Sequence, residues 1–220
     1  TCLMNSCYPI SQKELLGYGI TGVHEAGIEF EELQLLSEMV SDNELSINVY
    51  AMLNPSRENR EFALEKGIFT LKNLSVRSFK AYVDGALGSS GALLKQDYLD
   101  KKDYKGLCLM NPDELNELAE FCLDVGYQLN SHGIGDSAIA IILDMCSNVY
   151  KRNPDHRFRI EHAQIIDTSD IKDKAYSFED AARNNTIGIN PFVIDAYEAK
   201  ILGTPEGSAR KSHDAVKKLI

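Results

Sequence analysis

Residues 111–132, NPDELNELAEFCLDVGYQLNSH, hold the pattern that decides the fold. Asn111 is a good helix N-cap, and Glu114 stands where it completes a capping box. The apolar positions that follow recur at helical spacing until Gly126, a residue type that commonly ends a helix. Tyr127–His132 is then expected to form a β-strand. This stretch therefore predicts a helix that leads directly into a strand.

The same alternation of strand and helix patterns continues on both sides of this stretch. Strands are predicted at residues 19–24, 45–53, 78–83, 127–132 and 157–160, and helices at residues 31–40, 57–66, 112–125 and 137–150. Strands that alternate with helices are typical of βαβ units and of a mainly parallel sheet. We therefore predict an α/β fold.

Residues 172–220 do not continue this alternation of strand and helix patterns. They offer one helical stretch, Phe178–Arg183, one short apolar run, Phe192–Ile194, and otherwise polar residues. We divide the chain into residues 1–171, which hold the central strands and helices, and a C-terminal segment whose structure the pattern does not predict. Because the chain begins with Thr1 rather than Met, we expect its true N-terminus to lie upstream.

The charge balance is acidic, with 33 Asp and Glu against 23 Lys and Arg and a formal net charge of -10. The densest basic group, Lys101, Lys102 and Lys105, is interrupted by Asp103 and is interpreted as a solvated loop. Binding to nucleic acid needs concentrated positive charge and is not expected. The sequence has no run of about 18 apolar residues, so a membrane span is not expected either.

The cysteine pattern indicates a reducing compartment. The chain has five cysteines, an odd number, and no CxxC spacing, which argues against both a zinc knuckle and a disulfide framework. Cys122 and Cys146 fall within helical apolar patterns, so we predict that both thiols lie in the core. The cytoplasm is the compartment that these features predict.

Three potential metal ligands stand at or near the ends of predicted parallel strands: Lys80, His132 and His162. In a (β/α)₈ barrel these strand ends converge on one mouth, where the chemistry takes place. Two neutral imidazoles suit zinc or another borderline divalent ion, and an open position on that ion would activate water. Asp84 and Asp136 follow the same strands, and each is expected either to hydrogen-bond a ligand or to cap a turn.

Three stretches around these residues resemble a known family: residues 80–94 (KAYVDGALGSSGALL), 132–138 (HGIGDSA) and 159–164 (RIEHAQ). Residues 19–27 (GITGVHEAG) and 48–52 add support. The chain is similar over residues 14–171 to the amidohydrolase superfamily, in the branch that includes N-substituted formamide deformylase. This resemblance implies a (β/α)₈ TIM-barrel-like fold. Such a barrel usually needs about 250 residues, so a chain of 220 is expected to hold an incomplete one.

The resemblance also implies a metal site and a reaction. His132 and His162 correspond to the metal-binding histidines of barrel strands five and six, and Lys80 to the lysine of strand four. In this superfamily CO₂ can carbamylate that lysine, which turns a cationic amine into an anionic group that bridges two metal ions. The implied cofactor is a divalent metal, zinc, as one or two ions. The implied reaction is hydrolysis of an amide or formamide-type C–N bond in a small molecule.

Two parts of the family's site are not found. Such enzymes carry a His-x-His pair on the first strand, and this chain contains none. They also carry a general-base Asp after strand eight. Asp195 is the only late Asp after an apolar run, and we interpret it as a helix or loop residue, so the catalytic base is unassigned. Residues 177–207 show only a faint likeness to the family's closing segment. His24 is interpreted as a barrel-wall residue, while His156 and His213 have polar, surface-like neighbours.

Two alternatives to an active hydrolase stay open. One is a non-catalytic remnant or fragment of such a hydrolase, in which the metal site does not assemble, and the missing His-x-His pair favours it. The other is a different α/β fold that uses the same histidines as acid and base. The exposed edges of an unclosed barrel would also allow the chain to form a homodimer.

Overall fold

The computed structural model describes residues 2–167, 169–170 and 187–189. The chain forms two compact units. The first unit consists of Thr1–Lys80 and Phe121–Leu129, and the second of Ala81–Glu120 and Asn130–Ile220. Each unit has its own packed elements, so the two are described in turn.

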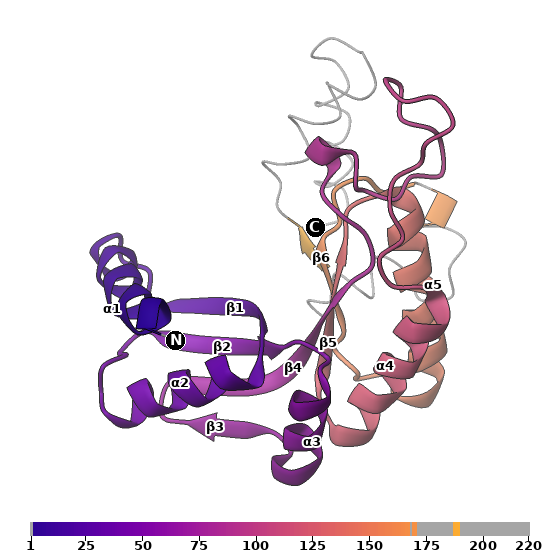
Figure 1. The fold of residues 1–220 in the computed structure, drawn as a ribbon. Coiled ribbons are helices and arrows are strands. Elements are labelled where there is room, and N and C mark those ends of the chain that lie inside the picture. The colour runs from indigo at the N-terminus through magenta and orange to yellow at the C-terminus, as the bar shows by residue number, and fades with distance from the viewer. Residues whose placement is uncertain (1, 168, 171–186, 190–220) are drawn as a thin grey trace. The chain divides into compact units, whose positions relative to one another are not determined.

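The first unit is built on parallel strands. It contains α1 (Cys2–Gly17), β1 (Gly22–Ile28), α2 (Phe30–Ser41), β2 (Asn48–Leu53), α3 (Arg57–Lys66), β3 (Phe69–Leu71) and most of β4 (Leu74–Tyr82). β1 pairs in parallel with β2, and β2 with β4, whereas β3 pairs antiparallel with β4. Figure 1 shows α2 lying alongside these strands. The βαβ pattern predicted from the sequence is therefore present in this unit.

Helix α2 and strand β4 supply much of the core of the first unit. Glu29 and Glu32 form a capping box at the start of α2, and the helix then buries Leu36 and Val40 completely. Phe79 of β4 is also fully buried, and its ring lies 5.6 Å from the ring of Phe121 in α4 (Pro112–Val125). Burial of side chains of this size contributes about 1.5–3 kcal/mol each.

The second unit continues the parallel arrangement. It contains a 3-10 turn η1 (Leu87–Ser89), the first part of α4 (Pro112–Val125), most of β5 (Gln128–Gly133), α5 (Asp136–Arg152), β6 (Arg159–His162) and β7 (Ile187–Ile189). β5 pairs in parallel with β6, and β6 with β7. Just after β4, the Val83 N–H donates a hydrogen bond to the His132 carbonyl at 3.1 Å.

Strand β5 and helix α5 approach each other closely at Gly133. A Cβ atom at this position would lie 2.5 Å from Cδ1 of Ile142 in α5, so the end of the Ile142 side chain would have to move aside. Glycine therefore lets the end of the strand pack directly against the helix. This contact also fixes which face of β5 is turned toward α5.

Most predicted elements are confirmed, with shifts at their ends. The helices at 57–66 and 112–125 match α3 and α4. The predicted capping box is also confirmed, because Oδ1 of Asn111 accepts the N–H of Glu114 and Oε2 of Glu114 accepts the N–H of Asn111, both at 3.0 Å. The strand predicted at 19–24 lies instead at Gly22–Ile28, since the left-handed Gly19 still belongs to the preceding turn.

Two predictions about burial are confirmed and one is wrong. Cys122 and Cys146 are buried, and burial raises the pKa of the Cys146 thiol to about 12. Lys101 and Lys102 are exposed, as expected of a solvated loop. His156, whose sequence neighbours are polar, is instead only 5% exposed. Its Nδ1 accepts the Phe158 N–H at 2.9 Å, so a local turn folds the ring inward.

Several predictions lie outside the described residues. These are the helix at 178–183, the apolar run at 192–194, the family likeness at 177–207, Asp195 and His213. The boundary predicted at residue 171 also adjoins this part of the chain. Among the described residues, no helix has both the length and the apolar character needed to cross a membrane.

Candidate metal site at the strand ends of the second unit

The structure brings His132 and His162 together at the ends of β5 and β6. Their ring centroids are 4.6 Å apart, and the rings meet edge to face at 69°. The His132 side chain is 13% exposed, whereas His162 is exposed. Two of the three predicted ligands are therefore neighbours, with one ring set deep and the other facing solvent.

Strand alternation explains where His132 points. Side chains alternate between the two faces of a strand, so His132 and Asn130 lie on the face opposite to Gly133. Gly133 is turned toward α5. The His132 ring therefore faces away from the helix layer, and Asn130 lies two residues before it on the same face.

His162 reaches the same place through an unusual backbone. Its φ is 75°, and that of Ala163 is 44°, so two consecutive residues other than glycine are left-handed. Each such residue costs roughly 1–2 kcal/mol. Regular alternation would place His162 on the face of Ile160, which lies toward Gly133 on the α5 side. The left-handed turn instead leaves the His162 ring against His132.

Asp84 supports His132 from behind. This carboxylate is 1% exposed and accepts the backbone N–H groups of Ile134, Gly135 and Leu93 at 3.0, 2.8 and 2.9 Å. Its Oδ1 also lies 3.5 Å from Nε2 of His132. Burial raises the pKa of Asp84, although the backbone hydrogen bonds oppose that rise. Because its lone pairs are already engaged, Asp84 orients His132 and is not itself arranged as a metal ligand.

Asp136 caps a turn, which is the second of the two roles expected for Asp84 and Asp136. Its Oδ1 accepts the N–H of Ser137 at 2.9 Å and that of Lys95 at 2.8 Å. It therefore caps the turn at the start of α5. Asp84 contacts a candidate ligand, whereas Asp136 does not.

Sequence reasoning missed Tyr82 as a neighbour of His132. The ring of Tyr82 lies 5.9 Å from the His132 ring. In the strand register, Glu161 is the partner of His132, and its Oε1 accepts a hydrogen bond from Nε of Arg159 at 2.7 Å. Alternation could have indicated Arg159 and Glu161 as one pair, since they are two residues apart on one strand.

Lys80, the third predicted ligand, belongs to the first unit. It is 3% exposed and lies on β4, on the face opposite to the buried ring of Phe79. A lysine is seldom buried this deeply. Its participation in a site with the two histidines stays a prediction.

The two imidazoles fit a divalent metal in two respects. Imidazoles that bind one tetrahedral ion at about 2.0–2.1 Å have ring centroids roughly 5.2 Å apart, so the observed 4.6 Å requires only a small separation of the rings. Asn130 is completely buried, and neither polar atom of its amide has a hydrogen-bond partner. Against this, no cluster of three or more His, Cys, Asp or Glu side chains able to hold a metal occurs in the described part of the chain.

His24 lies in a different setting, in the first unit. It lines a cavity of 420 Å³ together with Asn48, Tyr50, Lys72 and Ser75, among others, at the N-terminal ends of β1, β2 and β4. Its ring centroid is 4.8 Å from that of Tyr50. In barrel enzymes the chemistry is found at the opposite, C-terminal ends of the strands. This placement agrees with the interpretation of His24 as a wall residue.

Comparison with known proteins identifies the family. The profile of the amidohydrolase family matches residues 9–177, which is most of the chain. The chain belongs to the amidohydrolase family. The strand-end histidines of the second unit lie within the matched residues, and so does Lys80.

Solved structures of two metal-dependent hydrolases share the fold. One is an uncharacterized metal-dependent hydrolase from Pyrococcus horikoshii OT3, with 25% identity, a TM-score of 0.73 and coverage of 88% of this chain. Another, from Pyrococcus furiosus, has 27% identity, a TM-score of 0.71 and coverage of 86%. The predicted metal-dependent hydrolase fold is confirmed. This chain spans 38% of each of those structures, in agreement with an incomplete barrel.

Two curated relatives match shorter stretches. Protein LONG AFTER FAR-RED 3 of Arabidopsis thaliana is 40% identical over 108 residues, which is 48% of this chain. The YtcJ protein of Bacillus subtilis (strain 168), named as an amidohydrolase, is 32% identical over 95 residues, which is 43% of this chain. In both cases the match covers 18% of the relative. Neither of these matches places the chain in the formamide deformylase branch.

Proposed function

We propose that this chain forms part of a metal-dependent hydrolase that cleaves an amide or formamide-type C–N bond, with His132 and His162 as metal ligands. The observation that carries the proposal is the edge-to-face pair of imidazoles at the ends of β5 and β6. Membership of the amidohydrolase family supports the reaction class. The substrate is expected to be a small molecule.

The residues around the pair suit metal binding. Asp84 faces Nε2 of His132, which favours the tautomer with its hydrogen on Nε2 and leaves Nδ1 with a lone pair for a metal. A bound divalent ion, zinc in this proposal, would supply Lewis acidity and lower the pKa of water. The buried amide of Asn130 would complete the polar lining on the same face of β5.

Lys80 is the proposed third ligand, on the strength of the family resemblance. A protonated amine repels a divalent cation, so this role requires carbamylation by CO₂. The reaction joins the amine nitrogen to the carbon of CO₂ and releases a proton, which leaves an anionic carbamate. Metal occupancy and modification of Lys80 are therefore expected to rise together.

Zinc titration of the purified chain tests the ligands. We expect His132→Ala and His162→Ala each to weaken zinc binding about 100-fold or more, beyond the usual 10–100-fold loss for supporting groups. His24→Ala is the matched control, because it removes an exposed imidazole from the first unit. Calorimetry measures the affinity, and elemental analysis gives the metal content. Equal zinc binding by all four proteins would exclude the histidine pair as ligands.

A second candidate is a non-catalytic remnant of such a hydrolase. The specific observations that favour it are the lack of a His-x-His pair in the sequence and of a three-residue ligand cluster among the described residues. The two functions are separated by incubating the zinc-loaded chain with a panel of N-substituted formamides and amides. Release of amine that disappears in His132→Ala supports the hydrolase. Zinc binding without amine release, with no CO₂ adduct on Lys80 by intact mass, supports the remnant.

A further inference from the structure

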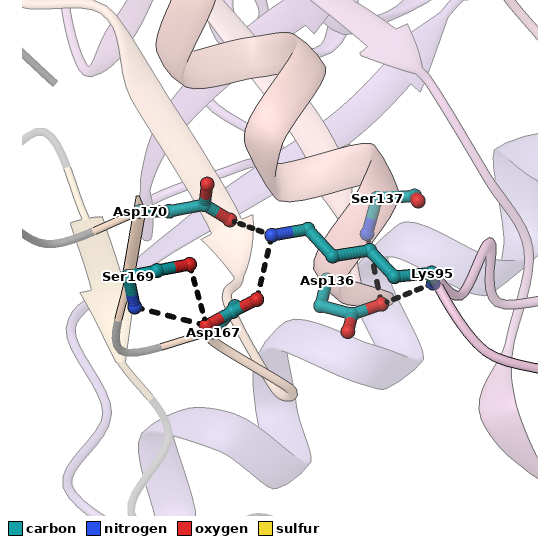
Figure 2. A network of polar contacts seen from close by, with 6 residues as sticks. All are labelled: Lys95, Asp136, Ser137, Asp167, Ser169 and Asp170. Carbon is teal, nitrogen blue, oxygen red and sulfur yellow. Dashed lines mark hydrogen bonds and ion pairs between the residues drawn. The ribbon is translucent and has the colours of Figure 1, made fainter. Parts of the chain in front are cut away.

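The loop that follows β4 is hydrogen-bonded to the start of α5. The Leu93 carbonyl accepts the N–H of Ser137 at 3.1 Å, and the Lys95 N–H donates to Oδ1 of Asp136 at 2.8 Å. The helix has no side-chain cap at Gly135. The loop backbone therefore takes the place of a cap for α5, and Figure 2 shows Lys95 beside Asp136 and Ser137.

The backbone of this loop lies too close to Gly135 and Gly106 for either position to carry a side chain. A Cβ atom at Gly135 would lie 2.0 Å from the Leu93 carbonyl oxygen, and one at Gly106 would lie 1.9 Å from that of Ala92. Both contacts are with backbone atoms, which cannot rotate aside. The loop is thus held at a defined position against the end of β5.

The Lys95 side chain extends this attachment to a third segment, the turn after β6. Its Nζ lies 2.7 Å from Oδ2 of Asp167 and 2.7 Å from Oδ2 of Asp170 (Figure 2). Asp167 is ordered in turn by Ser169, which donates both its N–H and its hydroxyl to Oδ1. We call Lys95, Asp136, Asp167 and Asp170 the Lys95 clamp.

The clamp is partly shielded from water, and its Lys95–Asp167 ion pair stays charged near neutral pH. The side chain of Lys95 is 31% exposed and that of Asp170 only 10%. Hydrogen bonds from Lys95 and Ser169 lower the pKa of Asp167 to about 2. Burial lowers the pKa of Lys95, but the two carboxylates outweigh it and raise the pKa overall. An ion pair of this kind is stronger than an isolated surface pair, because one amine serves two acids.

The clamp joins the two segments that carry the candidate metal site. Asp167 follows His162 along the turn after β6, and the N–H of Ile165 within that turn donates to the Ile134 carbonyl at 2.9 Å. On the other side, the Leu93 N–H donates to Asp84, the carboxylate behind His132. Lys95 therefore links the support of His132 to the turn that holds His162.

We propose that Lys95 is a positioning residue, whose clamp holds the left-handed turn after β6 in place and so keeps the His162 ring against the His132 ring. The inference rests on the proposed function only for its consequence for metal affinity. The packing of the two rings is itself independent of any metal. The experiment below therefore judges the clamp separately from the metal site.

The variants are Lys95→Met, Lys95→Arg and Lys102→Met. Methionine keeps the length of the lysine stem without its charge, whereas arginine keeps the charge and can serve two carboxylates. Lys102 is an exposed lysine of the same loop, so Lys102→Met is the matched control. Asp167→Asn removes one acid only and serves as the milder variant if Lys95→Met does not fold.

The decisive measurement is the nuclear Overhauser effect between the ring protons of His132 and His162 in metal-free, ring-labelled chain. We expect it in the wild-type, Lys95→Arg and Lys102→Met proteins and expect its loss in Lys95→Met. Amide hydrogen exchange over residues 163–167 should be about tenfold faster in Lys95→Met only. Zinc affinity should fall about tenfold in the same variant and recover in Lys95→Arg.

Retention of the ring-to-ring effect in Lys95→Met, with exchange at the wild-type rate, would overturn the inference. Failure of the proposed function has a different signature. In that case the wild-type chain binds no zinc, while the ring-to-ring effect still depends on Lys95. Loss of the effect in Lys102→Met as well would also count against the clamp, because it would show a general response to lost charge.

Discussion

The two units each hold a histidine against a second aromatic ring, and the pairs differ in what surrounds them. In the first unit His24 lies 4.8 Å from Tyr50, and in the second His132 lies 4.6 Å from His162. The first pair lines an open cavity at the N-terminal ends of its strands. The second is backed by the buried Asp84 and depends on a left-handed backbone. The groups around each ring pair, more than the ring contact itself, distinguish the candidate site at His132 and His162 from the wall residue His24.

The largest contrast between the units should come from their glycines. Gly135→Ala would force a Cβ to within 2.0 Å of the Leu93 carbonyl, whereas at Gly22 in the first unit the nearest atom is 3.6 Å away. We expect Gly135→Ala to lower the free energy of unfolding by roughly 3–5 kcal/mol. Gly22→Ala should change it by no more than about 0.5 kcal/mol. Urea unfolding measures both, and similar losses would mean that the loop moves aside freely.

Asp84→Asn should remove the carboxylate charge beside His132 while keeping the size of the side chain at position 84. An amide cannot accept all the hydrogen bonds that the carboxylate accepts from Ile134, Gly135 and Leu93. We expect a loss of roughly 3 kcal/mol in the free energy of unfolding and a fall in zinc affinity of about 10–100-fold. An unchanged zinc affinity in a folded Asp84→Asn protein would remove Asp84 from the candidate site.

A pH titration of stability should detect the buried His156 of the second unit. Burial lowers its pKa from 6.5 to about 4, so the unfolded chain binds this proton more readily than the folded one does. The free energy of unfolding is unaffected by this group above pH 6.5, and it falls as the pH drops toward 4, by roughly 3 kcal/mol. His156→Gln should flatten that part of the urea-unfolding profile. A slope that persists unchanged in His156→Gln would assign it to other groups.

Tyr50→Phe tests the ring pair of the first unit and should have only a small effect on stability. The Tyr50 hydroxyl donates to Oε1 of Gln128 at 2.8 Å within the first unit. Its removal should lower the free energy of unfolding by about 1 kcal/mol. Zinc affinity should not change, because Tyr50 lies beside His24 at the N-terminal ends of its strands and is not one of the proposed ligands. A clear fall in zinc affinity would show that the wall around His24 takes part in the site.

The sequence predicted best those helices whose ends are set by capping or helix-ending residues within or beside the helix. Helix α4 was found because Asn111 and Glu114 cap it, and α3 because Gly67 ends it. Helix α1 was missed because Pro9 interrupts it and its apolar positions hardly favour one face. Strands β3 and β7 were missed because each has only three residues, too few to show a period.

The candidate site was predictable only in part for the same reason. His132 and His162 stand where strand patterns end, and that position alone suggested a shared mouth. The left-handed φ of His162 has no sequence signal, since nothing in RIEH requires it. The acceptors and donors of Asp84 and Lys95 are far along the chain and follow from tertiary contacts. Sequence patterns therefore indicated the ligands but not the groups that hold them.

The left-handed backbone at Ala163 has a consequence for engineering. Glycine occupies such a conformation without steric cost, so directed evolution under heat alone is expected to select Ala163→Gly. The same substitution would widen the range of conformations open to the neighbouring imidazole. Variants selected for heat resistance alone would then be poor starting points for engineering catalysis. Screens on this scaffold should therefore select for turnover and heat resistance together.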